Sequence, residues 1–212
     1  MALDTYANLQ TAILNRIDMG GDSEMVAAVP DFITVAEAEI VRWAKVVWLE
    51  KRDTLTATTA FVDLPADFNG FRAVQLEYQN QRFSVMQVSP DMLDLIEPSN
   101  VTDIPQYYAV HAEQVEFRPA PASGTDFDVT YYFKPTVLSD SNTSNEILVN
   151  APDLLFYRSL AEAYDHIQNE GMAAKYMQMY ARARDDILKD SARRRWDGNP
   201  MRMQADSLRV MY

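Results

Sequence analysis

The sequence contains no cysteine, two histidines and six glycines among its 212 residues. The absence of cysteine excludes disulfides, thiolate metal sites and a cysteine nucleophile. The two histidines, His111 and His166, have no HExxH or comparable two-ligand spacing, which argues against a histidine metal site. Neither a GxGxxG motif nor a Walker A motif occurs in this glycine-poor chain. These absences argue against a nucleotide-binding protein.

Other familiar signals are missing as well. Residues 1–10 have neither a basic region nor an apolar stretch, so we expect no signal peptide. No run approaches 18 apolar residues, which predicts no transmembrane helix. A GxSxG elbow is absent, although a Ser-His-Asp triad assembled from distant residues stays open. Carboxylates are so abundant that pairing any two has no predictive value, and we interpret Glu37, Glu39, Asp185 and Asp186 as solvated helix faces.

Charge is unevenly distributed along the chain. The net charge is −12, yet residues 193–212 hold five Arg and two Asp, a net of +3, which leaves −15 for residues 1–192. An acidic body argues against a broad nucleic-acid-binding surface, because phosphate binding needs clustered Lys and Arg. The basic end is either a solvated, frayed terminus or a segment that meets an acidic partner.

Apolar residues at helical spacing predict four main helices. The first, over residues 5–18, ends before Gly20 and Gly21; the others cover about residues 30–48, 152–167 and 172–192. Proline followed by aspartate opens the second and third, while residues 22–29 are predicted as a loop or a short helix. The helices therefore form an N-terminal pair and a C-terminal pair.

A β-rich region separates the two pairs. Strands are predicted at about residues 54–62, 71–78, 83–88, 106–110, 114–118 and 126–133, with a short helix from Ser89 to Ile96. Such short strands at regular spacing favour a small antiparallel sheet or barrel. The segment Ser139–Asn145 is predicted as a polar loop.

The predicted fold class is therefore α+β. Two helix pairs bury their apolar faces most readily by packing together, which predicts a four-helix bundle with an inserted small antiparallel β module and an extended C-terminal tail. The expected boundaries are residues 1–52 plus 147–192 for the bundle, 53–146 for the β module and 193–212 for the tail.

The tail contains the candidate binding residues. Arg193, Arg194 and Arg195 either complement the dipole of the preceding helix or, with Trp196, form a charge-steered anchor. Beyond the helix, methionines are either packed or form an adaptable binding surface. The full candidate set is Arg193, Arg194, Arg195, Trp196, Met201, Arg202, Met203, Leu208, Arg209, Met211 and Tyr212.

Short segments in order along nearly the whole chain resemble the head-to-tail adaptor proteins of short-tailed phages, the group that includes the tail accessory factor. They are Thr5–Leu9, Pro30–Ile33, Ala36-Glu37, Trp48, Arg52, Leu64–Phe68, Pro105, Tyr107-Tyr108, Phe117–Pro121, Val129–Tyr132, Leu138–Asn145, Ala151–Leu154, Arg194–Trp196 and Pro200–Arg202.

The resemblance implies a non-enzymatic structural protein of the virion, made in the host cytoplasm. Its subunits would form a homo-oligomeric ring, expected to have twelve members, beneath the portal protein at the head-to-tail junction. The ring would extend the DNA ejection channel, without sequence-specific DNA binding, and would present a platform to tail nozzle or fibre proteins. Residues 193–212 would be the portal anchor. No cofactor, metal or membrane is implied.

Two alternatives belong to other functional classes. A virion-associated cell-wall hydrolase would use Asp or Glu as acid and base, and a carboxyl with a raised pKa in a cleft would be its signature. A non-catalytic binding module would hold its ligand in the β region, in a deep apolar pocket.

Overall fold

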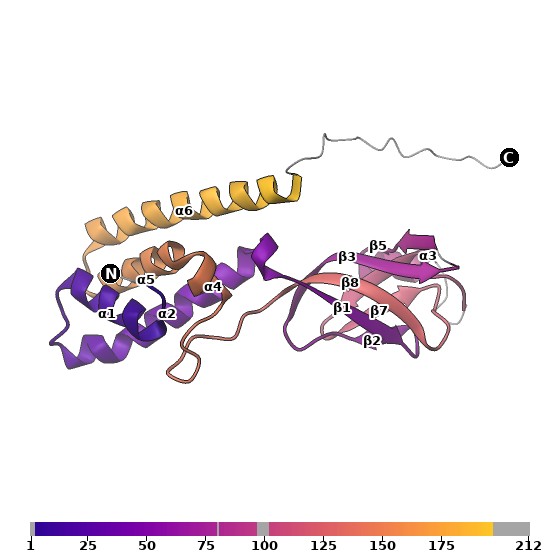
Figure 1. Cartoon of the computed structure of the whole chain (residues 1–212), viewed down its shortest axis with the longest axis horizontal. Helices are drawn as coiled ribbons and strands as arrows, with labels where there is room; N and C mark the ends of the chain where they lie inside the picture. Colours follow the sequence, from indigo (N-terminus) through magenta and orange to yellow (C-terminus); the bar gives the residue numbers. More distant parts are fainter. Residues whose placement is uncertain (1–2, 80, 97–101, 197–212) are drawn as a thin grey trace. The chain divides into compact units, whose positions relative to one another are not determined.

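The structure is a computed structural model that describes residues 3–79, 81–96 and 102–196 (Figure 1). The chain divides into two compact units. One is formed by Met1–Ile40 together with Val137–Tyr212, and the other by Val41–Thr136. Each unit is described by itself.

The first unit is helical. Its described helices are α1 (Tyr6–Ile17), most of α2 (Ser23–Trp43), α4 (Glu146–Asn150), α5 (Pro152–His166) and α6 (Glu170–Trp196). The Thr5 hydroxyl caps α1 by accepting a hydrogen bond from the amide of Asn8 at 3.3 Å. The helix ends at Asp18, which has a left-handed backbone with φ of 58°.

Helix α2 begins earlier than predicted. The Asp22 carboxylate accepts hydrogen bonds from the amides of Glu24 and Met25, so the helix starts at Ser23 and not at Pro30. Pro30 therefore lies inside the helix, where it removes one backbone donor without ending the helix. The helix also stops at Trp43, before a 3₁₀ turn, η1 (Val47–Leu49). One long helix replaces the predicted loop and helix.

The prediction of a four-helix bundle is wrong. The described residues form six α-helices, including the unpredicted α4 and the short α3 (Pro90–Ile96) of the second unit. Helix α6 has 27 residues against 15 in α5, its main packing partner, or about 40 Å against about 22 Å. Because α6 extends beyond α5, Tyr176, Tyr180 and Ser191 are the only side chains buried among its residues 170–195.

The second unit contains two four-stranded sheets, and not one small antiparallel sheet. The first sheet has the order β1-β8-β3-β4 and the second β2-β7-β6-β5. The strands are β1 (Glu50–Ala57), β2 (Phe61–Asp63), β3 (Phe68–Tyr78), β4 (Gln81–Ser84), β5 (Met86–Gln87), β6 (Tyr107–His111), β7 (Gln114–Arg118) and β8 (Thr125–Phe133).

A single extended stretch contributes to both sheets. Strand β4 pairs antiparallel with β3, and the amide of Val85 still bonds the carbonyl of Val74. The chain then changes partner, because the Met86 amide bonds the carbonyl of Gln106 and β5 pairs parallel with β6. This change of partner introduces the parallel pair that the alternating pattern did not predict.

Both sheets share one apolar core. Alternate residues of β8, which include Phe127, Val129 and Tyr131, point inward, and the Phe117 and Phe127 rings stack at 4.0 Å. Burial raises the pKa of Tyr108, beside Phe117 in this core, to about 12. The opposite face of β8 carries Asp126 and Asp128. Alternation along the strand thus gives the first sheet a polar outer face.

Candidate interaction site

Helix α6 is fastened to its unit near its N-terminal end. The buried ring of Tyr176 stacks on Tyr164 of α5, with centroids 5.4 Å apart and planes 6° apart. Its hydroxyl accepts a hydrogen bond from Nε of Arg16 at 2.6 Å, and the Tyr164 hydroxyl donates to the Arg16 carbonyl at 3.1 Å. These contacts fix the first turns of α6 against α1 and α5.

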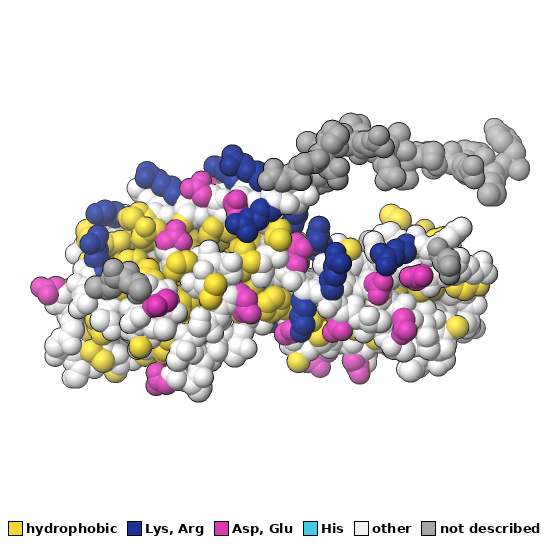
Figure 2. Space-filling view, viewed as in Figure 1, with side chains coloured by type: hydrophobic (Ala, Val, Ile, Leu, Met, Phe, Trp, Pro, Cys, Tyr) yellow, Lys and Arg dark blue, Asp and Glu magenta, His cyan; other side chains and the backbone are white. Residues whose placement is uncertain are grey.

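The C-terminal half of α6 has a large exposed surface. Leu188 remains 40% exposed, and Arg193, Arg194 and Arg195 are exposed in the last turn. Nε of Arg194 lies 2.8 Å from Oδ2 of Asp190, a solvated pair of small energetic weight. Lys and Arg side chains, dark blue in Figure 2, follow the exposed side of this helix.

The predicted site residues are only partly within the described structure. Arg193, Arg194 and Arg195 lie inside α6, which continues to Trp196 and not to about Ala192 as predicted. Arginine is a good helix former, and cations favour the last turn of a helix, so the helix extends through them. The remaining candidates lie outside the described residues: Met201, Arg202, Met203, Leu208, Arg209, Met211 and Tyr212.

A buried carboxylate joins α2 to the segment that returns from the second unit. Glu37 is only 3% exposed, and its Oε1 accepts a hydrogen bond from Nδ2 of Asn145 at 2.6 Å. The amide of Leu138 also donates to this carboxylate, at 3.1 Å to Oε2. The interpretation of Glu37 as part of a solvated face is therefore wrong.

Asn145 has two structural roles at once. While its Nδ2 bonds Glu37, its Oδ1 accepts a hydrogen bond from the amide of Leu148 at 3.0 Å and caps α4. The predicted polar loop thus ends in a buried side chain that starts a helix. Burial raises the pKa of Glu37, while the bonds from Asn145 and Leu138 oppose that rise.

The second unit has its own buried ionic group. Glu116 is 3% exposed, and its Oε1 lies 2.7 Å from Nη2 of Arg118, which is also buried. Nη2 of Arg118 also lies 2.8 Å from Oδ1 of Asp94, and Nη1 donates to the Leu93 carbonyl at 3.3 Å. Arg118 therefore attaches α3 to β7.

Helix α3 and the neighbouring strands expose apolar side chains. Leu93 is fully buried, whereas Met92 is 52% and Leu95 80% exposed. Met86 of β5 is 62% exposed, and Phe83 of β4 is also exposed. Because this set belongs to edge strands and one anchored helix, it is a candidate contact surface for another protein.

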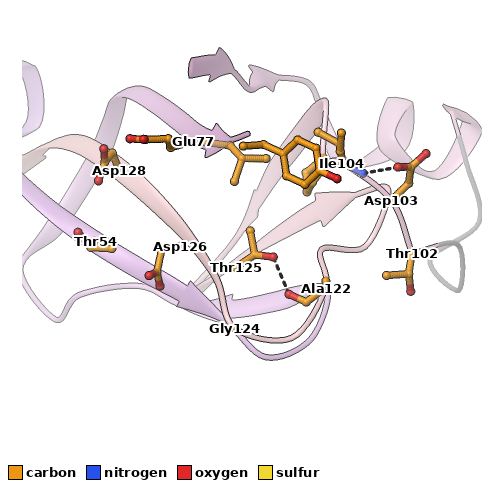
Figure 3. Close-up of a pocket in the computed structure, with 13 residues that line it drawn as sticks. Thr54, Glu77, Thr102, Asp103, Ile104, Ala122, Gly124, Thr125, Asp126 and Asp128 are labelled. Carbon is orange, nitrogen blue, oxygen red and sulfur yellow. Dashed lines mark hydrogen bonds between the residues drawn. The ribbon is translucent and has the colours of Figure 1, made fainter. Parts of the chain in front are cut away.

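A hollow at one end of the β-rich unit is a poor candidate for a small-molecule site. It has a volume of about 750 Å³ and lies beside the ends of β3 and β8 (Figure 3). Carboxylates of Glu77, Asp103, Asp126 and Asp128 line it, together with threonines. It is open and acidic, unlike the deep apolar pocket expected of a ligand-binding module.

The histidines do not form a catalytic group in the described structure. Nε2 of His111 lies 3.1 Å from Oε2 of Glu116 but outside hydrogen-bond geometry. The His166 ring lies against Phe32, with centroids 5.3 Å apart. Across residues 3–79, 81–96 and 102–196, no three His, Asp or Glu side chains converge as a metal site.

Sequence reasoning missed both buried ionic sites. Asn145 directly precedes the apolar run Ile147-Leu148, which is the pattern of a helix N-cap, and that signal could have located α4. Nothing local distinguished Glu37 from the exposed acids of its helix. The Glu116–Arg118 pair could have been suspected from two opposite charges on one face of a strand.

Comparison with known protein families gives the remaining evidence. The family model described as SU10 adaptor protein matches residues 4–204. A search of curated proteins finds no match. None of the described helices is both long enough and apolar enough to cross a bilayer. With nearly the whole chain matched, from before α1 to beyond α6, the protein belongs to the SU10 adaptor protein family, a family of structural phage adaptors.

Proposed function

We propose that this phage adaptor assembles as a ring of about twelve identical subunits beneath the portal protein of its virion, the ring size expected from its resemblance to head-to-tail adaptors. The ring extends the DNA channel and presents a docking platform to tail nozzle or fibre proteins. The match to the adaptor family over residues 4–204 is the observation that supports this proposal most strongly. The excess of acid in residues 1–192 suits a channel along which DNA slides without adhering.

Residues 193–212 are the proposed portal anchor. Arg193, Arg194 and Arg195 extend from the exposed end of α6, and Arg202 and Arg209 follow in the sequence. A segment of Arg, Met and Leu suits binding to a surface with acidic and apolar residues, because methionine adapts its shape and arginine pairs with carboxylates.

The second unit is the proposed platform for the tail. Its exposed Met86, Met92 and Leu95 supply an apolar contact surface. Met92 and Leu95 belong to α3, which the hydrogen bond from Arg118 to the Leu93 carbonyl holds in place. Rigid presentation reduces the entropy lost on binding.

Native mass spectrometry of the protein mixed with the portal of its phage tests the proposal. We expect a discrete complex with many adaptor copies per portal ring. If a folded adaptor and an assembled portal do not associate, the proposed function is wrong.

Truncation separates the anchor from the rest of the chain. A chain that ends at Trp196 retains all of α6, so we expect it to stay folded and to lose portal binding. Arg193→Glu, Arg194→Glu and Arg195→Glu together should also weaken binding in the full-length chain. Undiminished portal binding by both the truncated chain and the triple Arg→Glu variant would refute the anchor assignment.

A further inference from the structure

Helix α6 carries a regular row of cations on its exposed side. Lys175, Arg182 and Lys189 are all exposed and follow one another at intervals of seven residues. Seven residues make almost two helical turns, so the three side chains share one side of the helix at spacings of about 10 Å.

Helix α2 has a complementary row of acids. Glu24 and Asp31 are exposed and also stand seven residues apart, and the exposed Ala38 takes the next position in the row. Val35, beside this row, is 44% exposed. Residues 1–40 hold seven acidic side chains and one Arg, a net of −6, whereas α6 holds seven cations and four acids, a net of +3.

The two rows cannot meet within one subunit. Helix α5 lies between them, because its Arg158 pairs with Glu39 of α2 and its Tyr164 stacks on Tyr176 of α6. The basic row lies on the side of α6 away from the buried Tyr180 and Ser191, and its first member, Lys175, also lies over the Tyr176 ring at 5.9 Å. The acidic row lies on the side of α2 away from the buried Ile33 and Ile40. The helical unit therefore presents an acidic face and a basic face on opposite sides of α5.

We propose that the basic row of α6 docks on the acidic row of α2 of a second copy of this chain. The matched seven-residue spacing sets the charges of the two helices opposite one another, and Val35 provides an apolar contact beside the acidic row. The contact joins two different faces of identical subunits, and repetition of such a contact closes a ring. The inference rests on the proposed ring and specifies its subunit interface.

A DNA backbone fits the row less well than protein carboxylates do. Asp185, Asp186 and Asp190 lie among the cations of α6, and Asp186 is 3.9 Å from the ammonium of Lys189. Interspersed acids repel a continuous run of phosphates but accommodate carboxylates at fixed positions.

A charge exchange between two variants tests the interface. The first variant combines Lys175→Glu, Arg182→Glu and Lys189→Glu, and the second combines Glu24→Lys and Asp31→Lys. Alone, each sets like charges against each other, so we expect ring assembly on the portal to need at least about tenfold more protein. Mixed in equal amounts, they restore opposite charges at every contact, and full rings should return.

Two outcomes of this experiment would overturn the interface. One is full rings from either variant alone, and the other is no recovery in the mixture. As a control matched to the first variant, Arg52→Glu, Arg82→Glu and Lys134→Glu make the same change in net charge at exposed positions of the second unit and should leave ring assembly intact.

Cross-linking examines the same contact without the portal. The chain has no native cysteine, so an Asp31→Cys chain and an Arg182→Cys chain can be joined by a short bis-maleimide. We expect severalfold more heterodimer than from the Arg182→Cys chain mixed with a Val149→Cys control, whose site is 70% exposed. Equal yields would refute the interface even if the wild-type ring forms, whereas preferred cross-linking without portal binding would refute only the proposed function.

Discussion

Two carboxylates are almost equally buried in the two units of this protein, yet their partners differ. Glu37, in the helical unit, is bonded by neutral groups, the Asn145 amide and the Leu138 backbone N–H. Glu116, in the β-rich unit, is bonded by the guanidinium of Arg118. The neutral donors do not compensate the desolvation of Glu37, whose pKa is raised, whereas Glu116 has a fixed counter-charge.

The two buried carboxylates therefore stabilise contacts between elements in two different ways. The Glu116–Arg118 ion pair of β7 holds helix α3 against the second sheet as long as both charges are present. The Glu37 site holds the returning chain against α2, and its strength depends on whether a proton is bound.

The largest effect is expected from Arg118→Met. This change leaves Glu116 as an uncompensated buried charge and should lower the free energy of unfolding by about 3–5 kcal/mol. Urea unfolding followed by circular dichroism measures the loss. Adding Glu116→Gln removes the unpaired buried charge, so the double variant should regain a large part of the lost free energy of unfolding. A double variant no more stable than Arg118→Met would contradict the ionic explanation.

A smaller loss is expected from Asn145→Ala. It removes the cap of α4 and a donor to Glu37 together, which should lower the free energy of unfolding by about 2–3 kcal/mol. Asn150→Ala is the matched control, because that exposed side chain donates a hydrogen bond to the Glu146 carbonyl of its own helix, and its cost should stay within about 0.5 kcal/mol. Similar losses from the two variants would mean that the Glu37 site contributes little.

The smallest effect is a difference in pH dependence. Because the pKa of Glu37 is raised on folding, the folded state binds the proton more tightly than the unfolded state. The contribution of protonated Glu37 is therefore complete below the ordinary glutamate pKa and is lost as pH rises through the raised value. Free energies of unfolding across this range should fall with pH in the wild type more than in Glu37→Gln.

A control on the same helix sharpens this measurement. Glu39→Gln removes a carboxylate that already pairs with Arg158, so the excess fall with pH should persist in that variant. An identical pH profile for wild type and Glu37→Gln would show that Glu37 does not titrate in this range.

The sequence located four of the eight strands of the β-rich unit but not their division into two sheets. Alternation located β3, β6, β7 and β8 to within a few residues, because each has one face in the shared core. Alternation could not predict the pairing of β5 with β6, since strand order depends on contacts distant in sequence. The sequence predicts the start of α2 at Pro30 because proline favours a first helical turn, but the Asp22 cap starts the helix earlier, at Ser23.

The candidate site was predicted only as a segment. The cations after Ala192 were recognised, and α6 carries the first three of them in its last turn. The burial of Glu37 could not be predicted because an acid on a helix is usually solvated. Its burial depends on Asn145, 108 residues away in the sequence. Functional assignments to the other tail residues stay predictions.

The pairing of β1 with β8 has a consequence for the order of folding. Glu37 and Leu138 must meet across 101 residues of chain, and the entropy lost on closing a loop grows with its length. Strand β1 pairs with β8 from Glu50–Tyr132 to Ala57–Thr125, so this ladder alone brings both ends of the insertion together. We therefore expect the β-rich unit to form early, after which Glu37 and Leu138 are separated only by residues 38–49 on one side of the ladder and residues 133–137 on the other.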